Sequence, residues 1–398
     1  RKMQLCWQCR FWPCLMLILA KELSHGGKAR PIMLPKRRNN PLQYEPQKTI
    51  GILGSGQLGR MLVIAASQLG FRTHIFAPDA TNSPAGDIAH DCTEAAYDDL
   101  EALAAFASKI DAVTSEFENV PASAMAFLAK HCLASPGAAA LHTAQHRIRE
   151  KTLARDLGIE TPAFWHITNA ADLHHAMAEL GGDGVLKTCQ LGYDGKGQIR
   201  LSQHDDLVAG FATLATTDAI LEEMVAFRAE ASFLIARAAD GSIAHFPASL
   251  NEHKDGVLAR SVAPADLPVA VINAGQNAIQ KLATALDVTG LLALETFVTD
   301  DHRLLFNEIA PRPHNSFHWT IEGCASSQFT QLIRAVAGMP LGSTNCYGQW
   351  QMDNLLGGDM TRLDALAGTS GLHLHLYGKT EAKPSRKMGH TNRQIKPA

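Results

Sequence analysis

Short apolar runs separated by polar turns recur along the chain from residue 49 onward. Several runs end in a glycine or an acid, which is typical of buried strands whose carboxyl ends carry ligand-binding groups. Helical patterns, such as residues 60–69, lie between some of the runs. The expected strands are 49–53, 73–79, 112–121, 184–188, 219–225, 228–237, 290–298 and 304–310. We therefore expect a chain of mixed α/β and α+β structure.

The last two of these strands carry the acids on which the functional interpretation depends. Glu295 and Glu308 stand thirteen positions apart, each inside an apolar run. Mg²⁺ prefers oxygen ligands and is commonly held by one or two carboxylates together with substrate phosphates. Asn307 adds an amide oxygen, and Arg312 adds a planar fork of donors for phosphate. The alternative interpretation is an edge hairpin whose acids are simply solvated.

Composition sets wide limits on the function. The chain has 398 residues, enough for two or three domains, and its net charge of −3 creates no field that would recruit nucleic acid or an anionic membrane. From Cys92 onward the cysteines stand singly, which fits a reducing cytosol. Residues 1–46 differ from the rest, and their three cysteines and short apolar run match neither a zinc site nor a signal peptide. We interpret them as a disordered or artefactual tail.

A glycine-rich turn follows the first strand. Gly54, Gly56 and Gly59 form a GxGxxG pattern that opens a helix, and Asp79 ends the next strand. This is the arrangement of a dinucleotide-binding fold, with the acid placed for a ribose. It supports an NAD-dependent oxidoreductase as a rival hypothesis, although GxGxxG alone is a weak signal. Glu116 and Glu118 follow a later strand and are either ligand-binding acids or part of a solvated loop.

A second glycine-rich segment lies in the middle of the chain. Lys187 is on a strand, and the loop 192–198 with sequence GYDGKGQ follows it. Backbone amides of such a loop can fold over phosphate oxygens, while lysines supply charge. The alternative is a flexible hairpin turn. Glu222 and Glu223 end the next strand, where an acid can contact an adenine amino group or ribose hydroxyls.

Together these pieces resemble the ATP-grasp superfamily, and within it the N5-carboxyaminoimidazole ribonucleotide synthetases. The segments that carry the resemblance run in the family's order from residue 49 to about 391, and include GSGQLGRM, SEFENVP, LKTCQLGYDGKGQ, NEIAPRPHNS, MDNLLG and RKMGH. The resemblance implies a three-domain ATP-grasp fold. Its parts would be a Rossmann-like domain at 47–145, a small lid at 146–225 and a catalytic and C-terminal domain at 226–398.

The resemblance also implies an activity and its cofactors. Such enzymes make carboxyphosphate from bicarbonate and ATP, then carboxylate the exocyclic amine of aminoimidazole ribonucleotide. Magnesium, or manganese in its place, would be held by Glu295 and Glu308. ATP would be held by Arg147, Lys187, Gly192, Tyr193, Asp194, Gly195, Lys196, Gly197, Gln198, Glu222, Glu223, Glu230, His253, Asn307 and Glu308.

The acceptor side of the reaction follows from the same resemblance. Tyr193, Asp194, Arg312, His314 and Asn315 would lie near bicarbonate and the acceptor amine, with His314 or Asp194 taking a proton. Gln57, Lys379, Arg386 and Lys387 would bind the ribonucleotide, the three cations at its 5′-phosphate. A homodimer in the cytoplasm is implied, with only small-molecule substrates and no nucleic acid or membrane partner.

Three departures from the family pattern bear on activity. Phe317 stands where the family carries glycine. If the backbone there must adopt a positive φ angle, the bulky phenylalanine would displace His314 or Asn315. His146 stands where aspartate is usual, and the chain ends at Ala398, sooner after RKMGH than the resemblance implies. Besides the carboxylating ligase, a sister ATP-grasp ligase with another acceptor and an inactive binding homologue therefore stay open.

Overall fold

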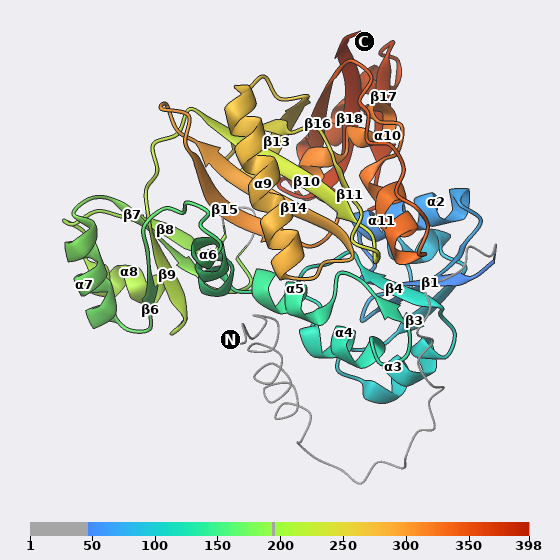
Figure 1. The fold of residues 1–398 in the computed structure, drawn as a ribbon, viewed down its shortest axis with the longest axis horizontal. Helices are drawn as coiled ribbons and strands as arrows, with labels where there is room; N and C mark the ends of the chain where they lie inside the picture. Colours follow the sequence, from blue (N-terminus) through green and yellow to red (C-terminus); the bar gives the residue numbers. More distant parts are fainter. Residues whose placement is uncertain (1–46, 193–195, 398) are drawn as a thin grey trace, which may run out of the picture.

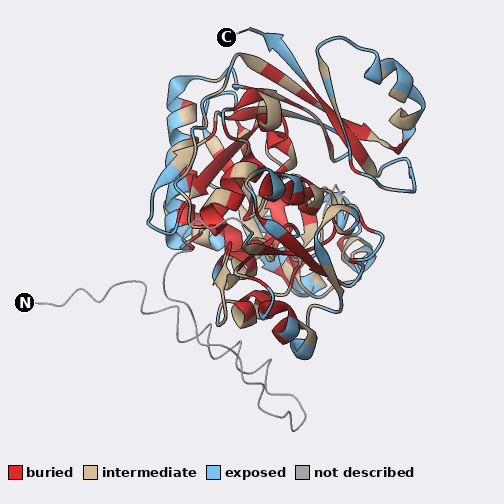
Figure 2. Ribbon diagram, turned by 90° about the vertical axis from the view of Figure 1, so that its right-hand side faces the viewer, coloured by how far each residue is buried: buried red, intermediate tan, exposed pale blue. Residues whose placement is uncertain are grey.

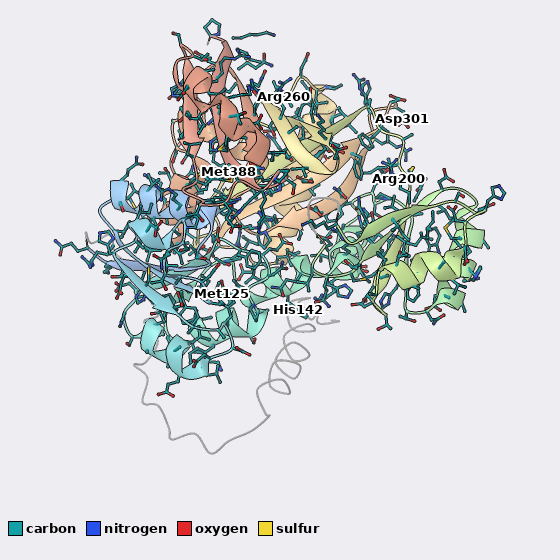
Figure 3. All side chains as sticks on the ribbon, turned by 180° about the vertical axis from the view of Figure 1, so that it is seen from behind. Met125, His142, Arg200, Arg260, Asp301 and Met388 are labelled. Atoms are coloured by element: carbon teal, nitrogen blue, oxygen red, sulfur yellow. The ribbon has the colours of Figure 1, made fainter. Side chains whose placement is uncertain are left out.

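The computed structural model describes residues 47–192 and 196–397. The proposed tail at 1–46 and three loop residues, Tyr193, Asp194 and Gly195, lie outside the described residues. The described chain forms three sheet-based units, which Figure 1 shows in blue, in green, and in yellow to red. Figure 3 shows them from behind, where Met125, Arg200 and Arg260 each mark one unit.

The first unit is a parallel five-stranded sheet with strand order β3-β2-β1-β4-β5. The glycine turn lies between β1 and the first helix. The strands are β1 (Thr49–Leu53), β2 (Arg72–Ala77), β3 (Asp91–Glu94), β4 (Ala112–Ser115) and β5 (Leu133–Ala134). The helices are α2 (Gln57–Gln68), α3 (Leu100–Ala107), α4 (Ala122–Leu128) and α5 (Ala138–Ala144), with a short 3-10 turn η1 (Gly86–Ile88).

The second unit is a small antiparallel sheet with strand order β6-β9-β7-β8. Helix α6 (Arg147–Asp156) leads into it. Its elements are β6 (Phe164–Ile167), α7 (Ala170–Leu180), β7 (Gly184–Thr188), β8 (Gln198–Leu201), α8 (Leu207–Thr213) and β9 (Ala219–Glu223). Local chemistry sets the ends of α7, because the Asn169 side chain accepts from the amide of Asp172 and Gly181 ends the helix at φ +68°.

The third unit is an antiparallel nine-stranded sheet with order β15-β14-β10-β12-β13-β16-β18-β17, and β11 also pairs with β10. Its strands are β10 (Ala229–Arg237), β11 (Ile243–His245), β12 (Ser249–Lys254), β13 (Val257–Ala263), β14 (Gly290–Val298), β15 (Leu304–Ala310), β16 (Gln349–Leu356), β17 (Leu372–Leu376) and β18 (Lys387–Lys396). The helical elements are α9 (Val269–Ala285), η2 (Asn315–Phe317), α10 (Thr320–Gly323), α11 (Gln328–Val336), η3 (Gly357–Arg362) and α12 (Leu363–Ala367).

Strands β10 and β14 are buried on both faces, which explains their nearly continuous apolar runs. Alternate residues pack against different helices. Phe233 and Leu292 belong to the core under α9, whereas Leu234 and Leu291 belong to the core under α11, which also includes residues of α2. Figure 2, coloured by burial, shows red strands in the interior of the molecule and pale blue segments at its outside. Helix α11 thus joins the first unit to the third.

The face under α11 turns polar towards one end of the two strands. Leu234 and Ala236 are apolar, but Ser232 and Glu230 follow on the same side of β10. On β14 the same face passes from Leu291 to Glu295. The sheet therefore carries its core and its candidate site on one continuous surface.

Phe317 requires no glycine geometry. Its φ angle is not among the positive values of the described residues, and it ends the short η2 turn. The ring is fully buried and lies 6.4 Å from the ring of Phe246 and 6.3 Å from that of Trp319, measured between centroids. The condition under which this residue would displace His314 or Asn315, a positive φ angle, is therefore not met, and the ring belongs to the core.

We expect Phe317→Ala to lower the free energy of unfolding by about 3–5 kcal/mol, since it removes a fully buried aromatic ring and leaves a cavity. Chemical denaturation followed by circular dichroism measures the change. The matched control is Val208→Ala on α8, whose side chain is exposed and whose truncation should change stability by less than about 0.5 kcal/mol. A Phe317→Ala protein as stable as the control would contradict this placement.

Candidate active site

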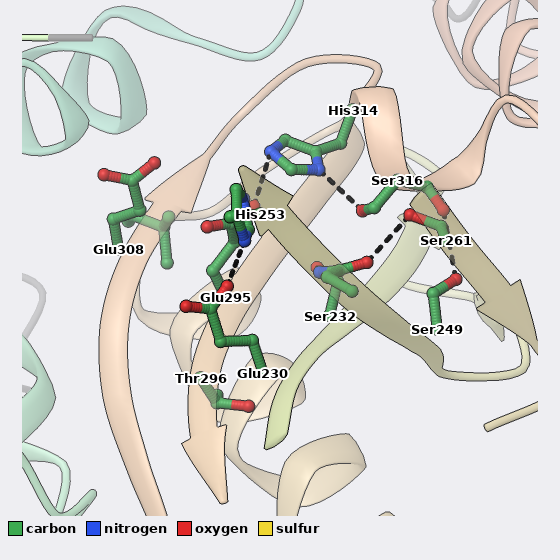
Figure 4. Close-up of polar contacts among 12 residues, drawn as sticks. Glu230, Ser232, Ser249, His253, Ser261, Glu295, Thr296, Glu308, His314 and Ser316 are labelled. Atoms are coloured by element: carbon green, nitrogen blue, oxygen red, sulfur yellow. Dashed lines mark hydrogen bonds and ion pairs between the residues drawn. The ribbon is translucent and has the colours of Figure 1, made fainter. Parts of the chain in front are cut away.

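The two acids predicted as metal ligands face each other across neighbouring strands. Glu295 of β14 pairs in register with Glu308 of β15, and a bulge follows at Thr296. Side chains of directly opposed residues on one face lie about 5 Å apart at Cβ. Figure 4 shows both carboxylates on the same side of the hairpin. Burial, followed by the charge of Glu308, raises the pKa of Glu295 to about 8.

Arg147 balances the second acid. Its Nη1 lies 3.1 Å from Oε2 of Glu308 and joins the start of α6 to the edge strand β15. Burial alone would raise the pKa of Glu308, but the charge and hydrogen bond of Arg147 outweigh it and hold the pKa below its usual value. The pair therefore differs internally: Glu308 is ionised at neutral pH, whereas Glu295 retains its proton to a higher pH.

Two histidines complete the surroundings of the acids. His314 Nε2 lies 3.2 Å from Oε1 of Glu295, and its Nδ1 lies 2.7 Å from Oγ of Ser316. Burial, then the charge of Arg312, holds the pKa of His314 well below its usual value, so its ring is neutral. His253 forms an ion pair with Glu230. Figure 4 shows both histidines beside Glu295.

A buried charge cluster lies behind the acids. Glu222 at the end of β9 contacts Nζ of Lys187 at 2.9 Å and Nζ of Lys151 at 3.4 Å. Burial would raise the pKa of Glu222, but the charges of Lys151 and Lys187 lower it to about 2. Lys151 also donates to the backbone oxygen of Asn307. The Glu222 carboxylate thus holds two lysines, while Glu223 accepts a hydrogen bond from the amide of Ala163.

The first unit contributes acids to the same site. Glu118 accepts a hydrogen bond of 2.9 Å from Nη2 of Arg312, so this acid holds the arginine that the sequence assigned to phosphate or bicarbonate. Both amide atoms of the Asn315 side chain are buried and have no hydrogen-bond partner among the described residues. A buried unpaired amide is costly, and a ligand in the cleft is what would satisfy it.

Glu116 occupies the place where the rival hypothesis puts a dinucleotide phosphate. Its two oxygens accept from the amides of Gly56 at 2.8 Å and Gly59 at 2.9 Å. A Cβ on Gly54 or Gly56 would come within 3 Å of the Glu116 side chain, which explains these two glycines without any cofactor. Asp79 accepts from the Ser55 hydroxyl. A pyrophosphate at this turn would have to displace the buried carboxylate, which argues against the NAD hypothesis.

Most of the predicted residues line one cleft of about 1460 Å³. It brings together residues of all three units. The predicted residues along it are Gln57, Arg147, Lys187, Gly192, Lys196, Gln198, Glu222, Glu223, Glu230, His253, Glu295, Asn307, Glu308, Arg312, His314, Asn315 and Lys387. Gly197, Lys379 and Arg386 do not line it.

The two remaining cations of the C-terminal cluster do not line the cleft, and each donates to a backbone oxygen of its own segment. Lys379 donates to the backbone oxygen of Lys387 at 2.8 Å and lies over the ring of Tyr377. Arg386 donates to the backbone oxygen of Glu381. The charge of Lys379 acts on the pKa of Glu116, so this lysine is near the glycine turn. Its side chain can therefore reach a ligand that extends from the cleft towards α2.

Sequence reasoning missed several residues of the site. Lys151 and Glu150 lie on α6 and are buried, with Glu150 accepting from the amide of Ile309. The roles of Glu116 and Glu118 as internal partners were missed as well. Only the charged character of the buried face of α6, in the segment REK (149–151), could have indicated that this helix borders a polar site.

The acid pair fits a divalent cation. The two carboxylates occupy opposed strand positions, and burial followed by the charge of Glu308 raises the pKa of Glu295. The pair is therefore short of positive charge. Oxygen donors of this kind suit Mg²⁺, and Mn²⁺ accepts similar ligands. Asn307 and Arg147 border the same region of the cleft. The fold and site together define an ATP-grasp enzyme.

Comparison with known proteins gives the same class in more detail. Family models match in three consecutive parts: a ribonucleotide synthetase preATP-grasp domain at 47–145, an ATP-grasp domain at 152–329, and a phosphoribosylaminoimidazole carboxylase C-terminal domain at 351–394. The chain is 47% identical to the N5-carboxyaminoimidazole ribonucleotide synthase of Brucella melitensis, over 89% of this chain and 98% of that protein. It is 43% identical to the Pseudomonas aeruginosa enzyme, over 86% and 93%.

Solved structures agree. The ADP complex of the Staphylococcus aureus N5-carboxyaminoimidazole synthetase superposes with a TM-score of 0.85 at 33% identity, covering 90% of this chain and 96% of that one. The Aspergillus clavatus enzyme with ADP and 5-aminoimidazole ribonucleotide gives 0.81 at 29%, covering 88% and 94%. The chain belongs to the N5-carboxyaminoimidazole ribonucleotide synthase family, which confirms the expected family and the three-part ATP-grasp fold.

We expect Glu222→Gln to destabilise the protein by about 3–5 kcal/mol at pH 7, because it leaves the buried Lys151 and Lys187 without a countercharge. The folded-state pKa of Glu222 is about 2 against a usual 4.5. Its stabilising contribution is therefore complete above pH 4.5 and is lost as the pH falls towards 2.

Thermal unfolding of the wild type and the variant between pH 8 and pH 3 measures this difference. Glu223→Gln is the control, since the neighbouring acid is exposed and its loss should cost less than about 1 kcal/mol. A gap between wild type and Glu222→Gln that stays constant down to pH 3 would show that ionisation of Glu222 is not its source.

Proposed function

We propose that this chain catalyses the ATP-dependent carboxylation of 5-aminoimidazole ribonucleotide with bicarbonate to N5-carboxyaminoimidazole ribonucleotide, in purine biosynthesis. The observation that carries the proposal is the opposed pair Glu295 and Glu308 in a cleft shared by all three units. The choice of acceptor is supported by identity to the Brucella melitensis enzyme along 98% of that protein. The rival hypothesis of an NAD oxidoreductase is not retained.

The nucleotide half of the reaction uses the side of the cleft next to the small sheet. Lys187 and Lys196 would neutralise ATP phosphates, and the glycine loop from Gly192 to Gln198 would cover them. Glu230 with His253, and the segment at Glu222 and Glu223, would face the adenosine. The Glu222 carboxylate itself is taken up by two lysines, so its contribution is to hold Lys187 in place.

Magnesium is proposed at Glu295, Glu308 and the side-chain oxygen of Asn307. When bound, the ion neutralises charge on the phosphate oxygens during phosphoryl transfer. The protein's own part is to keep Glu308 ionised through Arg147. It also keeps a proton on Glu295, next to His314. That proton must leave before the carboxylate can bind a cation.

The carboxylation half uses residues near the first unit. Bicarbonate oxygen attacks the γ-phosphorus and ADP leaves, which gives carboxyphosphate. The acceptor amine then takes the carboxyl group as phosphate leaves, and the amine loses a proton. Arg312, fixed by Glu118, and Asn315, with its buried unpaired amide, would orient these groups. His314 is neutral and both of its ring nitrogens have partners, so we propose that it positions rather than accepts protons. Tyr193 and Asp194 lie outside the described residues.

The remaining features stay predictions. Gln57, Lys379, Arg386 and Lys387 would hold the ribonucleotide, with the cations at its 5′-phosphate. A homodimer, a cytoplasmic location and the domain limits at 46, 145 and 225 follow from the resemblance and need their own tests. Within residues 47–192 and 196–397, no helix has the length and apolar character to cross a membrane.

The function is tested by measuring ADP release with magnesium, with and without bicarbonate and aminoimidazole ribonucleotide, in buffer stripped of carbon dioxide. We expect full turnover only when both are present, together with transfer of label from bicarbonate to the ribonucleotide. Turnover with glycinamide ribonucleotide and formate in place of these substrates would instead identify a sister ATP-grasp ligase. No turnover with any acceptor would support an inactive homologue.

We expect Glu308→Ala to lower turnover by on the order of 100-fold or more, the scale on which loss of a charge-stabilising group acts. The variant removes one metal ligand and the ion-pair partner of Arg147. Asp300→Ala is the control, because this exposed acid lies in the turn of the same hairpin and should leave the rate unchanged. An unaltered rate in Glu308→Ala would disprove the metal assignment.

We expect Lys379→Ala to raise the Michaelis constant for the ribonucleotide about 10- to 100-fold with little change in kcat, since a charged hydrogen bond to a remote phosphate is worth about 1.5–3 kcal/mol. Steady-state kinetics with each substrate varied separately measures it. Lys383→Ala, in the same segment but paired with Glu381 at the surface, is the control. A change confined to the constant for ATP would assign Lys379 to the other substrate.

A further inference from the structure

Four side chains of metal-binding type meet where α6 adjoins the small sheet. Asp218, just before β9, is their centre: its oxygens lie 3.1 Å from Nε2 of His146 and 2.9 Å from Nε2 of His166. The thiol of Cys189, directly after β7, donates to the same carboxylate. The ligand atoms of His146, Cys189 and Asp218 all lie within 4.8 Å of one another.

The donor set is that of a borderline-soft cation. Imidazole, thiolate and carboxylate are the three ligand types of zinc, at bond lengths of about 2.0–2.3 Å. Two ligands at tetrahedral angles on such an ion are about 3.3–3.8 Å apart. The two histidine contacts to Asp218, at 3.1 and 2.9 Å, would widen slightly around an ion, whereas the group of His146, Cys189 and Asp218, within 4.8 Å, would contract. Magnesium would not choose this set, because it prefers oxygen donors.

The surroundings give the cluster a buried side and an open side. Cys189 is buried and the His146 side chain is 14% exposed, whereas those of Asp218 and His166 are 38% and 47% exposed. An ion can thus reach the cluster from solvent past His166. Nδ1 of His146 is buried without a hydrogen-bond partner among the described residues. The hydrogen bond of this ring is the one between its Nε2 and Asp218.

Charge in the region is close to balanced for a dication. One carboxylate and one thiolate offset two positive charges. Two cations face the cluster. Arg147 acts on Cys189 and is paired with Glu308. The second cation is Arg149, whose charge lowers the pKa of His146 after burial has done so. Its Nη1 is bonded to the ring of His142 at 2.8 Å, which lies at the junction of the units in Figure 3. Arg149 is therefore held by another residue outside the ligand set.

We propose that His146, His166, Cys189 and Asp218 bind a zinc-class divalent cation, at a site separate from the acid pair Glu295 and Glu308. The site connects His146, the residue directly before α6, to three segments of the small sheet: strand β6, the end of β7 and the start of β9. The amide of Arg147 donates to the backbone oxygen of Cys189 at 3.0 Å. A bound ion would thus fix Arg147 relative to the strand that carries Lys187. His146 is also a position at which this chain departs from its family.

The test uses the purified full chain, stripped of metal by a chelator and titrated with Co²⁺. We expect one equivalent to give the near-ultraviolet charge-transfer band of a cobalt–thiolate bond and the visible bands of a tetrahedral ion, both removed by Zn²⁺. Zinc should also raise Tm. Cys189→Ser should abolish the charge-transfer band, and His166→Gln, at an exposed position, should weaken cobalt binding by about tenfold or more.

Matched controls separate this site from others. Cys132→Ser removes a cysteine of the first unit, and His175→Gln removes an exposed histidine of α7; both should keep the band and the affinity. Glu308→Gln should keep the band as well, which shows that the cobalt is not at the acid pair. Cys6, Cys9 and Cys14 can also supply thiolates. The Cys189→Ser variant is therefore the one that decides which cysteine binds the cobalt.

Three results would overturn the proposal. The first is no charge-transfer band in the wild type, which would leave the cluster as a hydrogen-bond network centred on Asp218. The second is a band that survives in a folded Cys189→Ser protein. The third is unchanged cobalt affinity in His166→Gln, whose circular dichroism would confirm that the variant is folded.

Discussion

Two carboxylates forced together on neighbouring strands, Glu295 and Glu308, are the constraint around which this cleft is arranged. Strand register places them opposite each other and on one face, and the bulge begins only after this pair. Burial makes their repulsion stronger than it would be in water. The protein relieves it unequally, with an arginine on Glu308 and a neutral histidine beside Glu295. The residual deficit of positive charge is the basis on which we propose a cation there.

The same need for countercharge connects the three units. Arg147 reaches from α6 to β15, Glu118 reaches from the first unit to Arg312, and Glu222 of the small sheet binds Lys151 of α6. Buried pairs of this kind add little net stability but are costly to break. They therefore fix the relative positions of the units at the place where a nucleotide would bind.

The sequence was sufficient for eight strands and for the two acids on neighbouring strands, because each leaves a local mark, whereas the glycine loop stays a prediction. An apolar run with one acid predicts a strand with a functional end, and GYDGKGQ predicts a phosphate loop. What the sequence could not supply is which groups meet over long separations. Lys151 carried no predicted role and Glu118 was either a ligand-binding acid or part of a solvated loop, yet their partners are 71 and 194 positions away (222 − 151; 312 − 118). Nor could it show that Phe317 belongs to the core.

The glycine turn after β1 shows why a local motif alone does not determine chemistry. Its backbone amides form an anion site of the kind that holds a dinucleotide phosphate in other folds. Here Glu116, sixty positions further on, already fills that site with a carboxylate. The turn is thereby kept rigid and its glycines are explained by close packing against Glu116. Ser55, Gln57 and Asp79 of this region then line the cleft, with the Ser55 hydroxyl donating to Asp79. The motif thus supports the wall of a substrate cleft because a distant residue has replaced its usual ligand.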